Sequence, residues 1–179
     1  MRTRSIYSSR SWGCPVHAEA LEWVARWAHG VSPLLVLDVG GRDINGNPDH
    51  LFHQDSTWHV VDLHAGPRVT WVGDFLDFGC VDRFDVVTHL EVAEHTAEWP
   101  EHLSHACHLL DPYEGAMVFT AAGPNRQPHS HIDGGPLREG EYYENVDPDA
   151  LSTVLDRLFA RHVIDLTSDG TDVRAVAWR

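Results

Sequence analysis

Residues 35–46 read LVLDVGGRDING, an apolar run that ends in an acid and a glycine-rich turn. A second apolar run, WHVVD, ends at Asp62, twenty-two residues after Gly40. A strand that leads into a glycine-rich turn, followed by a strand that ends in an acid about 20 residues on, is typical of a nucleoside-cofactor site. The glycine lets the main chain approach the ligand, and the later carboxylate accepts hydrogen bonds from ribose hydroxyls.

The chain has 179 residues, of which 42% are hydrophobic, so it can bury a substantial core. We expect an N-terminal tail over residues 1–14 and a single domain over 15–179. No apolar run reaches the ~18 residues that a membrane span needs, and the basic N-terminus is not followed by the apolar stretch of a secretion signal. We therefore expect a cytoplasmic protein that does not enter a membrane.

The formal net charge is −14, and all thirteen basic residues are arginines. Because nucleic-acid binding depends on phosphate neutralisation, this balance makes a nucleic-acid substrate unlikely. The three cysteines contain no Cys-x-x-Cys pair, which argues against a disulfide framework or a cysteine zinc site. The partner that we expect is a small-molecule or protein substrate, and an exposed sheet edge could also support a homodimer.

Apolar periodicity predicts alternating helices and strands. Helices are expected over 16–28 and 98–110, and a third runs to about residue 160 from Asp147 as N-cap, with Pro148 in the first position. The expected strands, in chain order, are 34–39, 58–62, 68–73, 84–88, 115–121, 162–167 and 171–178.

A Ser-Asp-Gly turn at 168–170 separates the last two strands and indicates a hairpin. Alternating helices and strands imply a mostly parallel sheet with helices on both faces. The predicted fold is therefore a three-layer α/β sandwich, with a seven-stranded sheet that ends in an antiparallel hairpin.

In this order of elements, the chain resembles a class I S-adenosylmethionine-dependent methyltransferase with a Rossmann-like fold. Four stretches carry the resemblance, which covers about residues 15–179: LVLDVGGRDING, VVDLHAGP, WVGDF, and FDVVTHLEVAEH with HLLDPYEGAMVFTAAGP. One departure is Arg42, which occupies the second glycine position of the common G-x-G-x-G motif. An arginine there could clamp the cofactor's carboxylate or point to solvent.

The resemblance implies that S-adenosylmethionine is the cofactor. Asp62 would bind the ribose, Gly40 would bring the main chain to the ligand, and Asp38 would orient the glycine turn through backbone amides. Asp74 and Phe75 would frame the adenine by a hydrogen bond and by stacking. The other implied cofactor contacts are Gly41, Leu63, His89 and Leu90.

The loop over 122–145 follows the fifth strand, at the edge where α/β sheets bind ligands. Its candidate catalytic residues are His129, His131, Asp133 and Tyr142, and either histidine could act as a general base near neutral pH. His129-x-His131-x-Asp133 also has a metal-ligand spacing, but the pattern is short and we expect no bound metal. Glu91, Glu94 and His95 are interpreted as a polar helix start.

Methyl transfer to a small molecule or protein-borne acceptor is the function that the resemblance implies. The alternative is a methyltransferase-like structural or cofactor-binding subunit without turnover. A nicotinamide-dependent oxidoreductase would need G-x-G-x-x-G and commonly a Tyr-x-x-x-Lys pair, and the chain has no lysine.

Overall fold

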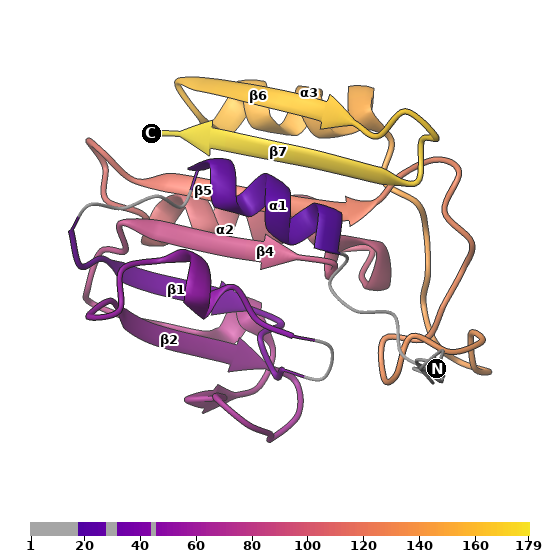
Figure 1. Ribbon diagram of the computed structural model, residues 1–179, viewed down its shortest axis with the longest axis horizontal. Helices are drawn as coiled ribbons and strands as arrows, with labels where there is room; N and C mark the ends of the chain where they lie inside the picture. The colour runs from indigo at the N-terminus through magenta and orange to yellow at the C-terminus, as the bar shows by residue number, and fades with distance from the viewer. Residues whose placement is uncertain (1–17, 28–31, 44–45) are drawn as a thin grey trace, which may run out of the picture.

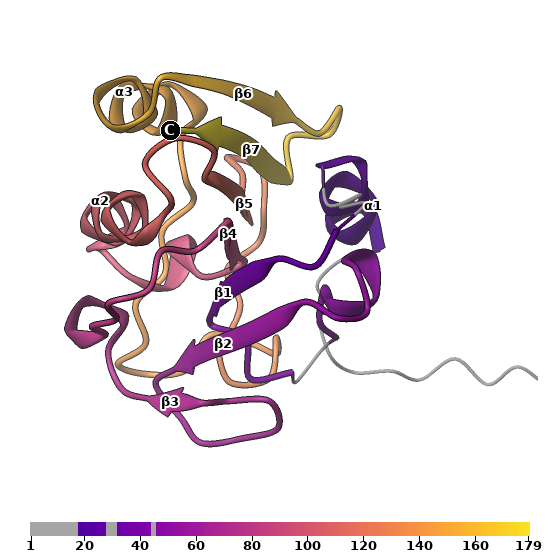
Figure 2. The same cartoon turned by 90° about the vertical axis from the view of Figure 1, so that its left-hand side faces the viewer.

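The computed structural model describes residues 18–27, 32–43 and 46–179. In these ranges seven strands form one sheet, in the order β3-β2-β1-β4-β5-β7-β6 (Figures 1 and 2). The first five strands are parallel, and β7 runs antiparallel to both β5 and β6. Their bounds are β1 Leu35–Val39, β2 Thr57–Asp62, β3 Trp71–Val72, β4 Val86–Leu90, β5 Ala116–Ala122, β6 Arg161–Leu166 and β7 Asp172–Trp178.

Helices cover both faces of the sheet, as predicted: α1 (Ala18–Trp27) lies on one face, and α2 (Trp99–Leu109) and α3 (Pro148–Leu158) lie on the other (Figure 2). Three short 3₁₀ helices follow strand ends: η1 (Asp49–Leu51), η2 (Phe75–Asp77) and η3 (Ala93–His95). None of the helices in the described ranges is long and apolar enough to cross a bilayer. The expected tail, residues 1–14, lies outside the described residues.

The two core clusters follow from the alternation of side chains along the central strands. Val36, Val118 and Val176 belong to a cluster with Trp23 and Val24 of α1. The neighbouring strand positions face the other way, toward α2 and α3, where they form the larger cluster; among them are Leu37, Met117, Phe119, Ala175 and Ala177. The strands are therefore buried on both faces, which explains their continuous apolar runs.

Two predicted strands differ from the observed ones by more than one residue at an end. The strand expected over 68–73 shortens to Trp71–Val72, because Arg68 has a left-handed φ of 67° that interrupts extended backbone. The strand expected over 84–88 is shifted to Val86–Leu90. Phe84 instead forms an isolated bridge to Leu110, and the Asp85 carboxylate accepts a 2.7 Å hydrogen bond from the Leu35 amide.

The predicted cap of α3 is confirmed and can be tested by substitution. Asp147 Oδ1 accepts hydrogen bonds from the amides of Asp149 (3.0 Å) and Ala150 (2.9 Å). Asp147→Ala should lower the free energy of unfolding by about 1 kcal/mol, because two amides lose their acceptor. Asp147→Asn keeps the acceptor oxygen and is the matched control. Urea unfolding measures both variants, and equal losses in the two would contradict this role for the cap.

Candidate functional site

The order in which strands are added to the sheet changes direction between β1 and β4, which makes this the topological switch point. From β1 the chain continues to β2 and β3 on one side, and it returns to β4 on the other side of β1. The crevice beyond the carboxyl ends of such strands is where open α/β sheets bind ligands. A cavity of about 260 Å³ lies there, and its lining includes Gly40 after β1, Asp62 at the end of β2 and Leu90 at the end of β4.

Both glycines after β1 are required by close contacts. Gly40 has a φ of 75°, and its amide donates a 2.8 Å hydrogen bond to the Val61 carbonyl. A Cβ at Gly40 would collide with the Val92 side chain, and one at Gly41 would collide with the Asp38 carboxylate. Gly40 lines the cavity with its main chain, whereas Gly41 packs behind the cavity wall.

Asp38 is buried and lies behind the cavity wall. Its carboxylate accepts hydrogen bonds from Thr88 Oγ1 (2.7 Å) and from Arg68 Nη1 (2.9 Å). Arg68 Nη1 also donates to the Gly41 carbonyl at 2.9 Å, and the guanidinium pairs with Asp49. Burial raises the pKa of Asp38, and the bonds to Arg68 and Thr88 offset part of the rise. Arg68 thus connects the Asp38 carboxylate to the Gly41 carbonyl in the described part of the glycine turn.

Arg42 lies against Asp62 and does not point to solvent. Its Nε is 4.0 Å from Asp62 Oδ1, the two side chains are only 18% and 11% exposed, and both residues line the cavity. Asp62 Oδ1 also accepts a 2.9 Å hydrogen bond from the His64 amide. The Arg42 Nε is buried without a hydrogen-bond partner among the described residues.

Leu63, Asp74 and Phe75 all line the cavity, in different ways. Leu63 is 60% exposed. The Asp74 side chain caps η2 by accepting a 2.9 Å hydrogen bond from the Leu76 amide. Phe75 is almost fully buried and packs edge-on against His102, with 5.3 Å between ring centroids. The ring of Phe75 is therefore mainly a core side chain, with one part at the cavity wall.

His89 and Leu90, at the end of β4, lie on different sides of the cavity wall. Leu90 lines the cavity, whereas the fully buried His89 side chain stacks on Phe119 and is outside the lining. His89 Nε2 lies 3.2 Å from His102 Nδ1, so one ring donates and the other accepts. Burial lowers the pKa of both histidines, and the neighbouring His102 lowers that of His89 further.

Of the four candidate catalytic residues in the loop after β5, two reach the cavity. His129 and His131 line it, together with the buried Ser130, which sequence reasoning missed. Asp133 pairs with Arg138 and Tyr142 donates to Glu144; neither is among the lining residues. The chain turns at residues 131–133, where the Gly134 amide donates a 2.8 Å hydrogen bond to the Ser130 carbonyl, so Asp133 does not join His129 and His131 at the cavity.

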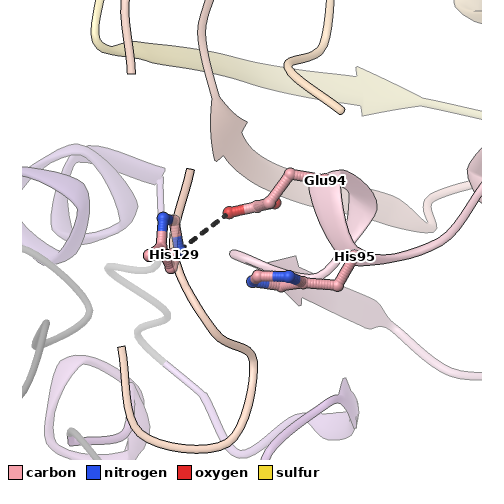
Figure 3. A group of neighbouring side chains, drawn as sticks. All are labelled: Glu94, His95 and His129. Atoms are coloured by element: carbon pink, nitrogen blue, oxygen red, sulfur yellow. Dashed lines mark ion pairs between the residues drawn. The ribbon is translucent and has the colours of Figure 1, made fainter. Parts of the chain in front are cut away.

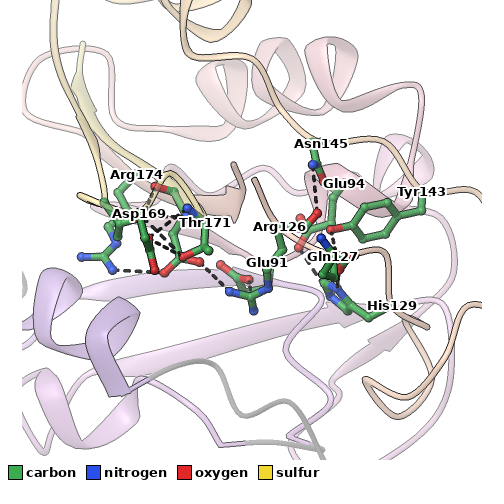
Figure 4. A network of polar contacts seen from close by, with 12 residues as sticks. Glu91, Glu94, Arg126, Gln127, His129, Tyr143, Asn145, Asp169, Thr171 and Arg174 are labelled. Atoms are coloured by element: carbon green, nitrogen blue, oxygen red, sulfur yellow. Dashed lines mark hydrogen bonds and ion pairs between the residues drawn. The ribbon is translucent and has the colours of Figure 1, made fainter. Parts of the chain in front are cut away.

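The loop is held against the carboxyl edge of the sheet by buried charges (Figure 4). Arg126 pairs with Asp172 of β7 at 2.7 Å and lies 3.8 Å from Glu91, the residue that follows β4. Glu91 has a left-handed φ of 57°, and burial raises the pKa of its carboxyl. The Glu144 amide donates a 2.9 Å hydrogen bond to the Glu94 carbonyl, which ties the far end of the loop to η3.

Glu94 and His95 were predicted as a polar helix start, but η3 directs them inward (Figure 3). Glu94 is 0% exposed, and burial together with the nearby Glu91 carboxylate holds its pKa well above the usual value. His95 lines the cavity, and burial followed by His129 and His131 lowers its pKa to about 4. Residue type alone gave no sign of this burial, although the position just after a strand end was a signal that these residues face the ligand edge.

The sequence matches no protein-family model and no curated protein. Solved structures nevertheless share the arrangement. One is the 1,6-didemethyltoxoflavin-N1-methyltransferase of Burkholderia thailandensis with 1,6-didemethyltoxoflavin and S-adenosylhomocysteine bound (TM-score 0.64, 18% identity, 88% of this chain and 77% of that chain covered). Another is the magnesium protoporphyrin IX methyltransferase of Synechocystis with S-adenosylhomocysteine bound (TM-score 0.60, 16% identity, 92% and 84% covered).

The chain has the class I S-adenosylmethionine-dependent methyltransferase fold. YcgJ of Bacillus subtilis is similar over almost its whole length (TM-score 0.67, 11% identity, 91% of this chain and 99% of that chain covered). The fold class expected from the sequence is therefore confirmed. In this methyltransferase fold, the cavity at the ends of β1, β2 and β4 is the candidate site.

The buried Asp38–Arg68 ion pair should contribute to the free energy of unfolding. Arg68→Met should lower the free energy of unfolding by about 3 kcal/mol or more, because it leaves a buried carboxylate without its cation. The double variant Asp38→Asn/Arg68→Met should recover much of the loss, since the uncompensated charge is gone. Arg138→Met, which breaks the exposed pair with Asp133, is the control and should have little effect. Additive losses in a double-mutant cycle would contradict the pairing.

The His89–His102 pair makes the fold sensitive to acid. The pKa values of both histidines are lower in the folded state than in the unfolded state. As the pH falls below about 6.5, the unfolded chain therefore binds more protons than the folded chain does. Stability should therefore fall toward low pH, by up to about 1.4 kcal/mol per pH unit for each such group. His89→Gln should flatten this decline in urea titrations between neutral pH and pH 5. His50→Gln, at an exposed position, is the control, and an equal flattening there would refute the assignment.

Proposed function

We propose that this protein binds S-adenosylmethionine in the cavity and transfers its methyl group to a small molecule. The observation that carries the proposal is the meeting of Gly40 and Asp62 in one cavity, at the point where the chain changes direction across the sheet. Two structures of similar fold contain S-adenosylhomocysteine, the demethylated product of this cofactor, which supports the proposal.

The residues around the cavity fit such a cofactor. Gly40 lines the cavity without a side chain, and Asp62 lines it too, which supports a role for the Asp62 carboxylate as acceptor of hydrogen bonds from ribose hydroxyls. Leu90 and Phe75 offer apolar contacts for the adenine, with Asp74 and Leu63 at the same wall. The buried Nε of Arg42, which makes no hydrogen bond among the described residues, is a candidate donor for the carboxylate of the methionyl group.

Bound S-adenosylmethionine supplies a methyl group on a positively charged sulfur, which is already a strong electrophile. The protein's task is therefore to align the acceptor with that methyl group, and to remove a proton where the acceptor carries one. His131 is suited to the second task. Its Nδ1 lies 3.2 Å from Glu141 Oε1, which orients the ring, and the ring lies at the cavity.

The chemical character of the wall favours a small polar acceptor. His64 stacks on His131 with an interplanar angle of 10°, and His95 and His129 line the same cavity, so its wall is rich in imidazoles. Asp133 and Tyr142 lie outside the lining and are not assigned a part in the chemistry.

Calorimetry with S-adenosylmethionine and S-adenosylhomocysteine tests the cofactor assignment. We expect both to bind, and we expect Asp62→Ala to weaken binding by about tenfold or more, because charge-assisted hydrogen bonds to the ribose are lost. Asp55→Ala, which removes an exposed carboxylate outside the cavity, is the matched control and should bind as the unaltered protein does. Absence of binding by the unaltered protein at millimolar cofactor would overturn the proposal.

Transfer of labelled methyl from S-adenosylmethionine to a panel of small hydroxyl, amine and carboxylate compounds tests turnover separately. Product formation on at least one class supports the enzyme. Cofactor binding without transfer to any acceptor would favour a non-catalytic cofactor-binding subunit.

A further inference from the structure

We infer that Glu94, His95 and His129 form a binding site for one divalent transition-metal ion at the cavity wall. Each residue offers one ligand atom, and the three atoms lie within 4.8 Å of one another. His129 Nε2 is 3.9 Å from Glu94 Oε1. Figure 3 shows the three side chains converging from two parts of the chain, η3 and the loop after β5.

The Glu94 carboxylate accepts no side-chain or main-chain hydrogen bond among the described residues. It is 0% exposed. A buried carboxylate is costly unless it is protonated, paired with a cation or bound to a metal. Arg126 lies in the same network but pairs with Asp172 at 2.7 Å and with Glu91 at 3.8 Å. A metal ion between Glu94 and the two imidazoles would give the carboxylate a partner.

The two imidazoles are oriented for coordination. His129 Nδ1 is 3.2 Å from the Gln127 carbonyl, which can only accept, so Nδ1 carries the proton and the Nε2 lone pair faces Glu94. Metal-binding histidines are commonly fixed by such a bond from the second ring nitrogen. In His95, Nδ1 is buried without a partner among the described residues.

The donor set selects the class of ion. Two imidazoles and a carboxylate suit Zn²⁺, Fe²⁺, Co²⁺ or Mn²⁺, whereas Mg²⁺ and Ca²⁺ favour oxygen ligands. Ligands about 2.1 Å from a tetrahedral ion are about 3.4 Å apart, so the 3.9 Å between Nε2 and Oε1 needs only a small closing movement. His95 and His129 line the cavity, so open coordination positions would face it and could hold and polarise an oxygen of a bound molecule.

This site differs from the His129-x-His131-x-Asp133 pattern of the sequence. His131 is paired with Glu141, and Asp133 with Arg138. Only His129 is common to both sets. The two arrangements therefore predict opposite effects for substitutions at Glu94 and at Asp133.

Titration of chelator-treated protein with CoCl₂, followed by the visible d–d absorption and by displacement with ZnCl₂, tests the inference. We expect one high-affinity equivalent of Co²⁺, and a rise in Tm on addition of Zn²⁺. No cofactor is present, so the result does not depend on the proposed function. If the unaltered protein binds no Co²⁺ or Zn²⁺, the inference fails whether or not S-adenosylmethionine binds.

Glu94→Gln should weaken Co²⁺ binding by at least about tenfold and abolish the Zn²⁺-dependent rise in Tm, because it removes a charged ligand at nearly constant volume. Asp133→Asn is the control and should bind metal unchanged. Circular dichroism checks that each variant folds, and His129→Asn replaces Glu94→Gln if the latter does not. Binding that survives Glu94→Gln, or that is lost in Asp133→Asn, would overturn the assignment.

Discussion

The structure depends on how β1 ends. Its last residues enter the turn beside a buried carboxylate, and Arg68 connects that carboxylate to the Gly41 carbonyl and to Asp49. These contacts, with Thr88 of β4 on the other carboxylate oxygen, join the end of β1 to its neighbour strand and to the segment before β3. The Asp38 carboxylate leaves no room for a side chain at position 41, so this close approach of the turn requires glycine there.

A second constraint is the number of ionisable groups placed near the cavity. Carboxylates and imidazoles lie close together there. Burial raises the pKa values of the carboxyls and lowers those of the imidazoles, so it favours the neutral form of both. A site of this kind can contain many titratable groups with few full charges. The strongly acidic composition of the chain therefore says little about the charge inside the cavity, which burial and neighbours decide.

The sequence was most informative for features that neighbouring residues determine by themselves, such as strands, turns and helix caps. Apolar runs located all seven strands, the glycine turn and Asp62 were placed at adjacent strand ends, and Asp147 was identified as a cap. It was least informative where burial of a polar residue depends on distant segments. Arg68 was included in a predicted strand, yet its left-handed backbone lets it reach Asp38, thirty residues earlier. Glu94 is fully buried and contacts His129 and Glu144 of the loop after β5, and local periodicity cannot predict such a distant contact.

The antiparallel last strand has a consequence for how the site is completed. Because β7 runs opposite to β5, its first residue, Asp172, lies at the ligand edge, where it anchors Arg126 forty-six residues earlier. The loop that carries His129 and His131 therefore depends on the C-terminal hairpin for the carboxylate that pairs with Arg126. A substitution in this hairpin can thus alter the cavity although no residue of β6 or β7 lines it.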